Sequence, residues 1–162
     1  MTGVVVMGVS GSGKSTIGAL LAIRLGVPFV DADSLHPAAN ITKMTGGRPL
    51  DDDDRWPWLA LVADELAARP EGSVVACSAL RVRYRDALRR DGDAVFFALL
   101  ALPVAGLSKR LNSRPGHFMP ASLLQSQLAT LEELEPQEWG ITIDASLPPT
   151  AIVDTIEHAV SR

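Results

Sequence analysis

Near its amino terminus the chain runs from a short apolar segment straight into a glycine-rich loop. Residues 4–7 (VVVM) are followed by residues 8–15 (GVSGSGKS), which match the pattern G-x-x-x-x-G-K-[ST] in full. Glycine lets the backbone curl tightly, so that its N–H groups point inward at phosphate oxygens without obstruction from side chains. The motif therefore predicts an α/β fold with a nucleotide site at the end of its first strand.

Each part of this loop has an expected task. The ammonium group of Lys14 should reach the β- and γ-phosphates of ATP, and the hydroxyl of Ser15 should bind Mg²⁺. A helix that begins near Lys14 adds the positive end of its dipole. ATPases, GTPases and kinases share the motif, so it does not decide what happens to the phosphate. The residues expected to bind ATP are Gly8, Ser10, Gly11, Ser12, Gly13, Lys14, Ser15 and Thr16, together with the more distant Arg110.

Short β-branched segments alternate with longer helical patterns along the whole chain, which is typical of a parallel sheet with crossover helices. A chain of 162 residues is long enough to bury one core without disulfides. We therefore expect a single α/β domain over residues 1–162. Its strands are expected at 3–8, 27–31, 73–78, 94–101 and 140–143, and its helices at 14–25, 35–45, 55–69, 81–90, 103–113, 120–133 and 149–161.

Charge and cysteine content exclude several classes of partner. Fifteen basic against 19 acidic residues give a formal net charge of −4, and the basic residues are not clustered as in a nucleic-acid footprint. Cys77 is the single cysteine, which rules out an intramolecular disulfide, and we expect it to be buried and inert. The apolar run before the loop is too short to span a bilayer and has no basic leader. We therefore expect a cytoplasmic protein that binds neither nucleic acid nor membrane.

Two aspartates follow the expected second strand. Asp31 and Asp33 stand at the carboxyl edge of the sheet, where open α/β folds bind ligands. If the backbone stays extended, both side chains point to the same side. Asp31 would then bind the metal, and Asp33 would orient or deprotonate an accepting hydroxyl. The alternative is that Asp33 only caps a helix at Leu35; next to a phosphate-binding loop, the catalytic role is favoured.

Residues 46–54 have the composition of a functional loop, with a glycine pair and four consecutive aspartates. At least two of these aspartates should be structural, with Asp54 as the N-cap of the next helix and Pro57 in its first turn. Arg55 is the first candidate for binding an anionic substrate and Arg85 the second, because a planar guanidinium matches a carboxylate. Either arginine could instead be a solvated helix residue or an ion-pair partner of the aspartates. Trp56, Trp58 and Trp139 are expected to serve in packing.

A second functional loop covers approximately residues 113–120 and is expected to be a mobile lid. Arg110 and Arg114 lie four residues apart, so both can swing over the triphosphate when the loop closes. There they would stabilise charge on the transferred phosphoryl group. The alternative is a basic last helical turn that interacts with the helix dipole.

Beyond the glycine-rich loop, the sequence resembles the gluconate kinases of the small P-loop kinase superfamily, over nearly its whole length. The segments DADSLHP and GRPLDDDDRWPWL and the lid sequence RPGHFM are much narrower signals than the loop itself. Ser34 departs from the family pattern, which often has a further acidic residue there. The segments that carry the resemblance are 31–37, 40, 43–44, 47–59, 77–80, 84–86, 110–111, 114–119, 126–127 and 131–132.

The resemblance implies a P-loop kinase fold with a five-stranded parallel sheet, and the reaction of ATP with gluconate to give ADP and 6-phosphogluconate. It also implies a homodimer. His36 could equally be a structural histidine. Two other functions stay open: a kinase for another small anionic acceptor such as shikimate, and an ATP-binding regulatory module with little turnover. By this reading Lys14, Asp33, Arg110 and Arg114 are catalytic, and Asp33, His36, Arg55, Arg85, His117 and Gln127 bind the substrate.

Overall fold

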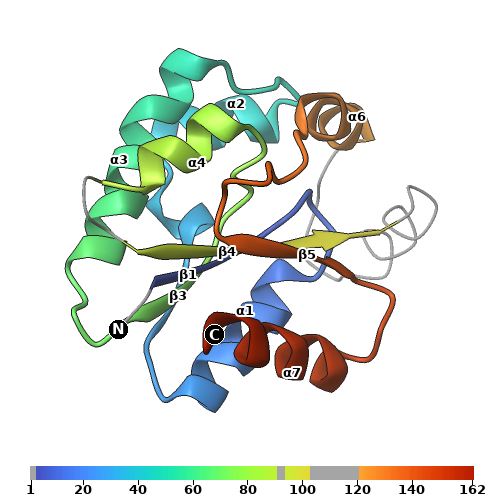
Figure 1. Ribbon diagram of the computed structural model, residues 1–162. Helices are drawn as coiled ribbons and strands as arrows, with labels where there is room; N and C mark the ends of the chain where they lie inside the picture. Colours follow the sequence, from blue (N-terminus) through green and yellow to red (C-terminus); the bar gives the residue numbers. More distant parts are fainter. Residues whose placement is uncertain (1–2, 91–93, 103–120) are drawn as a thin grey trace.

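A computed structural model describes residues 3–90, 94–102 and 121–162. Five parallel strands form one sheet in the order β2-β3-β1-β4-β5 (Figure 1). Each expected strand is present, and the differences are confined to strand ends. The strands are β1 (Gly3–Met7), β2 (Phe29–Asp31), β3 (Ser73–Ala76), β4 (Val95–Ala101) and β5 (Gly140–Asp144).

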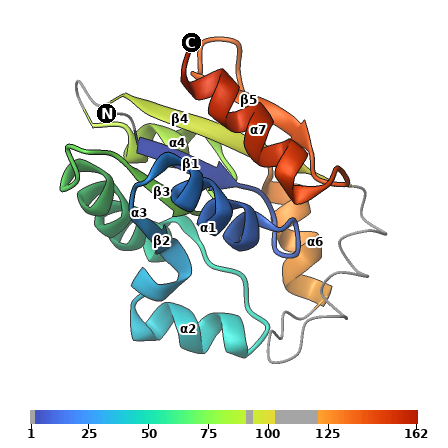
Figure 2. The same ribbon diagram turned by 90° about the horizontal axis from the view of Figure 1, so that it is seen from below.

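Helices cover both faces of this sheet. Figures 1 and 2 show α1 and α7 on one face, and α3 and α4 on the other. The expected helix at 103–113 and the expected lid at 113–120 lie outside the described residues. Among the helices that are described, none has the length and hydrophobicity of a membrane-spanning segment. The helices are α1 (Lys14–Leu25), the 3₁₀ turn η1 (Ala32–Leu35), α2 (Ala38–Thr45), α3 (Asp52–Ala67), α4 (Val82–Leu88), α6 (Ala121–Thr130) and α7 (Pro149–Val160).

The alternation of side chains along the strands creates two cores. In β1, Val5 and Met7 pack with the cluster under α3 and α4, whereas Val4 and Val6 pack with the cluster under α1 and α7. All four side chains are almost completely buried. Because both faces of the sheet are covered, its strands are continuous apolar runs rather than alternating ones.

The expected helix at 35–45 is divided in two. The 3₁₀ turn η1 ends at Leu35, and α2 begins only at Ala38. Between them His36 adopts an extended conformation, with φ −62° and ψ 133°. Pro37 explains the break, because a proline ring disfavours a helical conformation in the preceding residue.

Helix α3 begins three residues earlier than expected. Asp51, not Asp54, is its N-cap: the Asp51 carboxylate accepts from the Asp54 N–H at 2.9 Å, and the Asp54 carboxylate accepts from the Asp51 N–H at 3.0 Å. This reciprocal capping box satisfies two N–H groups at once, which a single cap at Asp54 could not do. The expectation that at least two aspartates are structural is confirmed. Pro57 consequently lies inside the helix rather than in its first turn.

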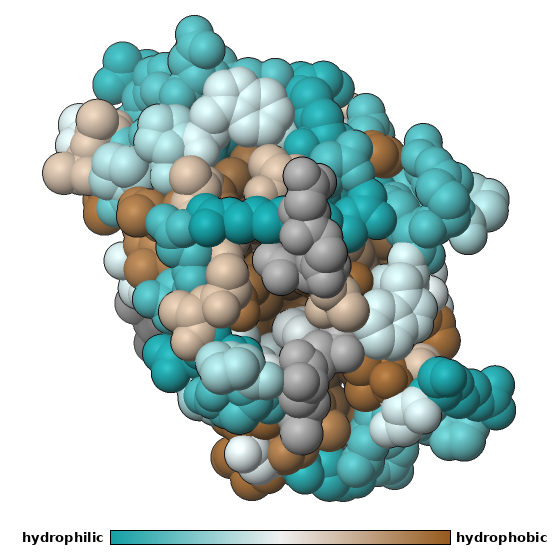
Figure 3. Space-filling view, turned by 60° about the vertical axis from the view of Figure 1, so that its left-hand side comes forward, coloured by the Kyte–Doolittle hydropathy of each residue, from teal (hydrophilic) through white to brown (hydrophobic). Residues whose placement is uncertain are grey.

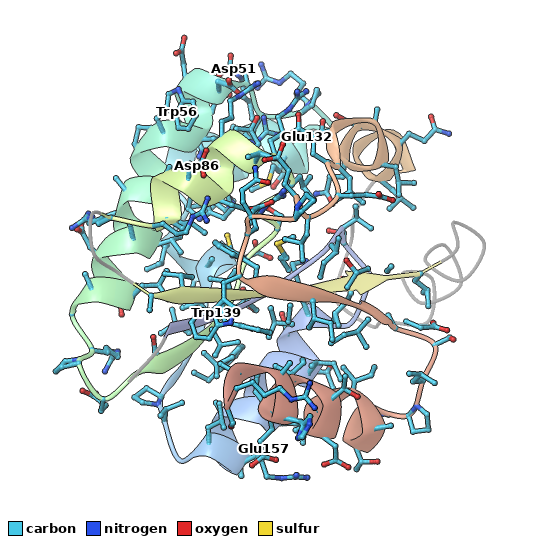
Figure 4. The ribbon with its side chains drawn as sticks, viewed as in Figure 1. Asp51, Trp56, Asp86, Glu132, Trp139 and Glu157 are labelled. Carbon is cyan, nitrogen blue, oxygen red and sulfur yellow. The ribbon has the colours of Figure 1, made fainter. Side chains whose placement is uncertain are left out.

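The three tryptophans differ in burial. Trp58 is 2% exposed, and its indole N–H donates to the carbonyl oxygen of Ala32 at 2.8 Å, which ties α3 to η1. Trp56 and Trp139 are 39% and 40% exposed and make edge contacts with Tyr84 and Phe96. Figure 4 shows Trp56 at α3 and Trp139 beside the sheet.

An irregular segment, residues 131–138, connects α6 to β5. It also contacts the first turn of α4 and supplies a hydrogen-bond acceptor there. Figure 4 places Glu132 between α4 and α6. Its backbone N–H donates to the carbonyl oxygen of Leu80 at 2.7 Å, and its carboxylate accepts from the N–H of Val82 at 2.8 Å. This second bond satisfies one of the free N–H groups at the start of α4, a task that local caps usually perform.

Figure 3 shows the side of the molecule on which the strands begin, where hydrophilic residues alternate with smaller apolar groups. Exposed or half-exposed ion pairs elsewhere join α3 to the residues that follow α3 and α4, including Asp64 with Arg90 and Glu65 with Arg69. Exposed pairs of this kind contribute little to stability. The glycine-rich loop lies at the opposite ends of the strands.

Candidate active site

The glycine-rich loop connects β1 to α1 in a left-handed backbone path. Gly8 and Gly13 have φ angles of 151° and 95°. A Cβ on Gly8 would lie 2.7 Å from the Ser12 Oγ and 3.0 Å from the Leu100 carbonyl oxygen, so a larger residue does not fit there. Helix α1 begins at Lys14 with Gly13 as its N-cap, and Lys14 is 9% exposed. Such a loop at a helix N-terminus is a ready anion site.

A serine–aspartate pair lies beside this loop. The hydroxyl of Ser15 donates to Asp31 Oδ2 at 2.8 Å, and Asp31 Oδ1 accepts from the N–H of Asp33 at 3.0 Å. Asp31 therefore caps η1, and the alternative in which Asp33 is the helix cap is wrong. Hydroxyl and carboxylate oxygens are the ligands that Mg²⁺ prefers, so the pair fits that ion.

The expectation of an extended chain through Asp33 is also wrong. The strand ends at Asp31, and η1 follows at once. The two aspartates nevertheless stay close, since the Asp33 N–H donates to the Asp31 carboxylate, and the charges of both, with that of Lys14, act on the thiol of Cys77, which follows β3. Cys77 is fully buried, as expected, and burial raises the pKa of its thiol to about 12, so the thiol stays protonated. The site thus gathers a lysine and two carboxylates at the carboxyl edge of the sheet.

His36 lies between Asp33 and helix α3. Its side chain is 4% exposed, its Nε2 is 4.0 Å from Asp33 Oδ1, and its ring stacks on Trp58 with centroids 4.0 Å apart. Burial lowers the pKa of His36; the Asp33 carboxylate opposes this shift and the positive charge of Arg55 adds to it. The imidazole is therefore neutral at pH 7. The charges of Asp33 and Arg55 thus act in opposite directions on the same imidazole.

Arg55 is anchored by a tyrosine to which the sequence analysis gave no role. Arg55 donates from Nη1 to the Tyr84 hydroxyl at 3.1 Å, and that hydroxyl donates to Asp52 Oδ1 at 2.5 Å. Arg83 pairs with the same aspartate at 2.7 Å. The hydrogen bond to Tyr84 therefore restrains the Nη1 side of the Arg55 guanidinium. Tyr84 could have been suspected because it lies in the segment shared with the gluconate kinases.

Arg85 does not lie in the site, which corrects its assignment to the substrate. Its side chain is 0% exposed, and it donates to Glu138 from Nε at 2.6 Å and from Nη2 at 2.8 Å. Its remaining N–H groups donate to the carbonyl oxygens of Ala79, Glu132 and Glu133. All five guanidinium hydrogens are thereby used. Arg85 holds the segment 131–138 onto α4 and has no donor left for a substrate.

Gln127 on α6 contacts the glycine-rich loop, because its Oε1 accepts from the N–H of Ser10 at 2.8 Å. The structure thus brings this expected substrate residue to the phosphate-binding end of the site. Thr16 is exposed in the first turn of α1. The other expected site residues, Arg110, Arg114 and His117, lie outside the described residues.

A surface hollow of about 590 Å³ lies elsewhere, between β5 and α7. Phe96, Trp139, Gly140 and His158 are among the residues that line it. Gly140 is the first residue of β5, so the hollow lies where that strand begins and the loop of β1 lies where its strand ends. The hollow therefore does not belong to the candidate active site.

The fold and the glycine-rich loop define a P-loop kinase, and residues 10–138 match the shikimate kinase family. A gluconokinase from Gluconobacter oxydans (strain 621H) is 46% identical over 155 residues, which cover 94% of this chain and 87% of that protein. On these grounds the chain belongs to the gluconokinase family.

Two solved structures agree with this assignment. A sugar kinase from Janibacter sp. HTCC2649 superposes with a TM-score of 0.93 and 47% identity, covering 99% of this chain and 95% of that one. A gluconokinase from Sinorhizobium meliloti 1021 has a TM-score of 0.89 and 46% identity, covering 99% of this chain and 92% of that one. The whole chain, including the active-site edge, therefore has counterparts of known structure.

Proposed function

We propose that this chain transfers the γ-phosphate of ATP to a hydroxyl of gluconate, giving ADP and 6-phosphogluconate. The observation that carries the proposal is the meeting of three groups at one edge of the sheet: the phosphate-binding loop, the Ser15–Asp31 pair, and Asp33, whose N–H donates to the Asp31 carboxylate. A kinase needs a nucleotide site and an acceptor site side by side, and these groups supply both. The gluconokinase relatives support gluconate as the acceptor.

At the nucleotide end, the loop N–H groups and Lys14 would hold the phosphates. Ser15 and Asp31 would hold Mg²⁺, which, when bound, neutralises negative charge on the phosphate oxygens. We also propose that Arg110 and Arg114, with His117, act from a lid at about residues 113–120. Arginines in that place would stabilise the transferred phosphoryl group and exclude water.

At the acceptor end, Asp33 would accept the proton of the attacking hydroxyl. Its side chain is 65% exposed and so is accessible to a small acceptor. Arg55 would bind the gluconate carboxylate through the guanidinium edge that Tyr84 leaves uncovered. Gln127 and His36 complete the proposed substrate contacts around Asp33 and the loop.

We further propose that the protein is a cytoplasmic homodimer. The family resemblance supports the homodimer, and the single buried cysteine, which suits a reducing compartment, supports the cytoplasm. Light scattering of the purified chain would test the dimer, since a monomer at micromolar concentration would contradict it.

The test of the proposed reaction is ADP release measured with ATP, Mg²⁺ and one acceptor at a time: gluconate, shikimate or the neutral polyol sorbitol. We expect rapid, saturable release with gluconate and a phosphorylated product in the mass spectrum. Faster release with shikimate would favour the other small-acceptor kinase. Slow release that no acceptor accelerates would favour an ATP-binding module with little turnover.

A further inference from the structure

A buried asparagine fixes the protonation pattern of His36. Asn40 is 3% exposed, and its Nδ2 lies 2.9 Å from the carbonyl oxygen of Asp54 and 3.2 Å from His36 Nδ1. A backbone carbonyl can only accept, so the atom facing Asp54 must be the amide nitrogen. Its second hydrogen then points at His36 Nδ1, which must accept it. Asn40 therefore assigns the single proton of the neutral imidazole to Nε2.

That proton faces the carboxylate proposed as the catalytic base. His36 Nε2 lies 4.0 Å from Asp33 Oδ1. This separation is about 1 Å longer than a hydrogen bond. The Asp33 side chain is 65% exposed and can close the distance when an acceptor binds, as catalytic hydrogen bonds often do.

The imidazole itself cannot turn to follow a different partner. It stacks on Trp58 with an interplanar angle of 15°, and Trp58 is fixed in turn by its hydrogen bond to Ala32. The charged groups that act on the ring are Asp33 from η1 and Arg55 from α3. Stacking and the Asn40 bond together hold the Nε2–H group in one direction.

We propose that Asn40 and His36 are positioning residues for Asp33. Asn40 sets the imidazole tautomer, and the His36 Nε2–H holds one oxygen of the Asp33 carboxylate, which leaves the other oxygen to accept the proton of the substrate hydroxyl. This inference deepens the proposed function and rests on it for the role of Asp33. His36 then acts on the substrate through Asp33, and this role replaces the direct substrate contact proposed for it above.

The tautomer can be tested without any substrate. In ¹⁵N-histidine-labelled full-length protein near pH 7, His36 should show a protonated Nε2 and an unprotonated Nδ1, assigned by the loss of its signals in His36→Phe. A protonated Nδ1, or a mixture of both tautomers, would overturn the proposal. Asn40→Leu should remove the preference; because this variant leaves the Asp54 carbonyl without its donor and is expected to melt at a lower temperature, the wild-type spectrum is the deciding measurement.

The positioning role is tested by two substitutions of His36, one that should lower kcat and one that should lower the melting temperature while keeping most of kcat. His36→Phe keeps a ring on Trp58 but removes the donor, so kcat should fall about tenfold or more with the KM for ATP unchanged. His36→Gln loses the stack but carries an amide donor near the place of Nε2, so it should retain most of kcat while melting earlier. As a matched control, His158→Gln on the exposed side of α7 should leave kcat unchanged.

Two outcomes would overturn the positioning role: wild-type kcat in His36→Phe, or equal kcat in the Phe and Gln variants. Asp33→Asn separates this failure from failure of the proposed function. If Asp33→Asn were fully active, the catalytic role of Asp33 would be wrong and the positioning role with it, while the tautomer would still be read from the spectrum. If Asp33→Asn were inactive and His36→Phe fully active, only the positioning role would be wrong.

Discussion

The two ends of the proposed site are built in different ways. The nucleotide end comes mostly from one continuous segment, in which a tight backbone path and the start of α1 create the cradle. The acceptor end is assembled from side chains on η1, α2, α3 and α4, linked by contacts such as Asn40 to His36 and Tyr84 to Arg55. A local motif can therefore specify the first, whereas the second depends on how the helices pack.

This difference has a consequence for substitutions. At the nucleotide end, the main groups are backbone N–H groups, Lys14 and the Ser15–Asp31 pair, so most damaging changes should fall within the loop or at Asp31. At the acceptor end, a side chain that never touches the substrate can still set the direction of one that does. The predictions below compare the two ends, beginning with the largest effect.

Lys14→Met should lower kcat for gluconate phosphorylation by about 10³-fold, because the charge on the β- and γ-phosphates is lost. The fold should be retained, since the methionine stem fills most of the same space. Steady-state kinetics and circular dichroism measure the two effects. A variant that keeps near-normal turnover would contradict the nucleotide assignment.

Asp33→Asn should lower kcat by about 10²-fold or more, because the amide keeps the shape of the carboxylate but cannot accept the proton. ATP affinity, measured by calorimetry, should be largely unchanged. Asp31→Asn is the contrasting control: it should raise the Mg²⁺ concentration needed for half-maximal rate, and excess Mg²⁺ should restore part of its activity. Retention of more than about a tenth of kcat in Asp33→Asn would exclude its role as base.

The same contrast explains which features the sequence could predict. The glycine-rich loop and the five strands were predicted because contiguous residues determine them. The start of α3 was misplaced because any of four consecutive aspartates can cap a helix, and only the reciprocal bonds of Asp51 and Asp54 decide between them. Arg85 was assigned to the substrate because its partner, Glu138, lies 53 residues away along the chain. No local pattern reveals such a pair.

Arg55→Lys should raise the KM for gluconate about tenfold while kcat changes little, because an ammonium group cannot replace a bidentate guanidinium. The variant should also distinguish gluconate from sorbitol less well than the wild type does.

Tyr84→Phe removes the anchor of Arg55 and should raise the same KM by a smaller factor, about threefold, since the guanidinium itself remains. The matched control is Arg83→Lys, which alters the same cluster around Asp52 and should leave the KM unchanged. Equal KM values in the wild type, Arg55→Lys and Tyr84→Phe would remove Arg55 from the acceptor site.

Arg85→Met should have the smallest effect on substrate binding and a large one on stability. Arg85 and Glu138 are buried together, with side chains 0% and 1% exposed, and removing one partner leaves an uncompensated charge, at a cost of about 3–5 kcal/mol. The melting temperature should therefore drop, while the KM for gluconate of the folded fraction stays near the wild-type value.

The double variant Arg85→Met with Glu138→Leu removes both charges and should melt higher than the single variant, because a well-packed apolar pair avoids the unpaired carboxylate. If Arg85→Met instead raised the KM for gluconate as much as Arg55→Lys does, with an unchanged melting temperature, Arg85 would belong to the acceptor site and its assignment to the segment 131–138 would be wrong.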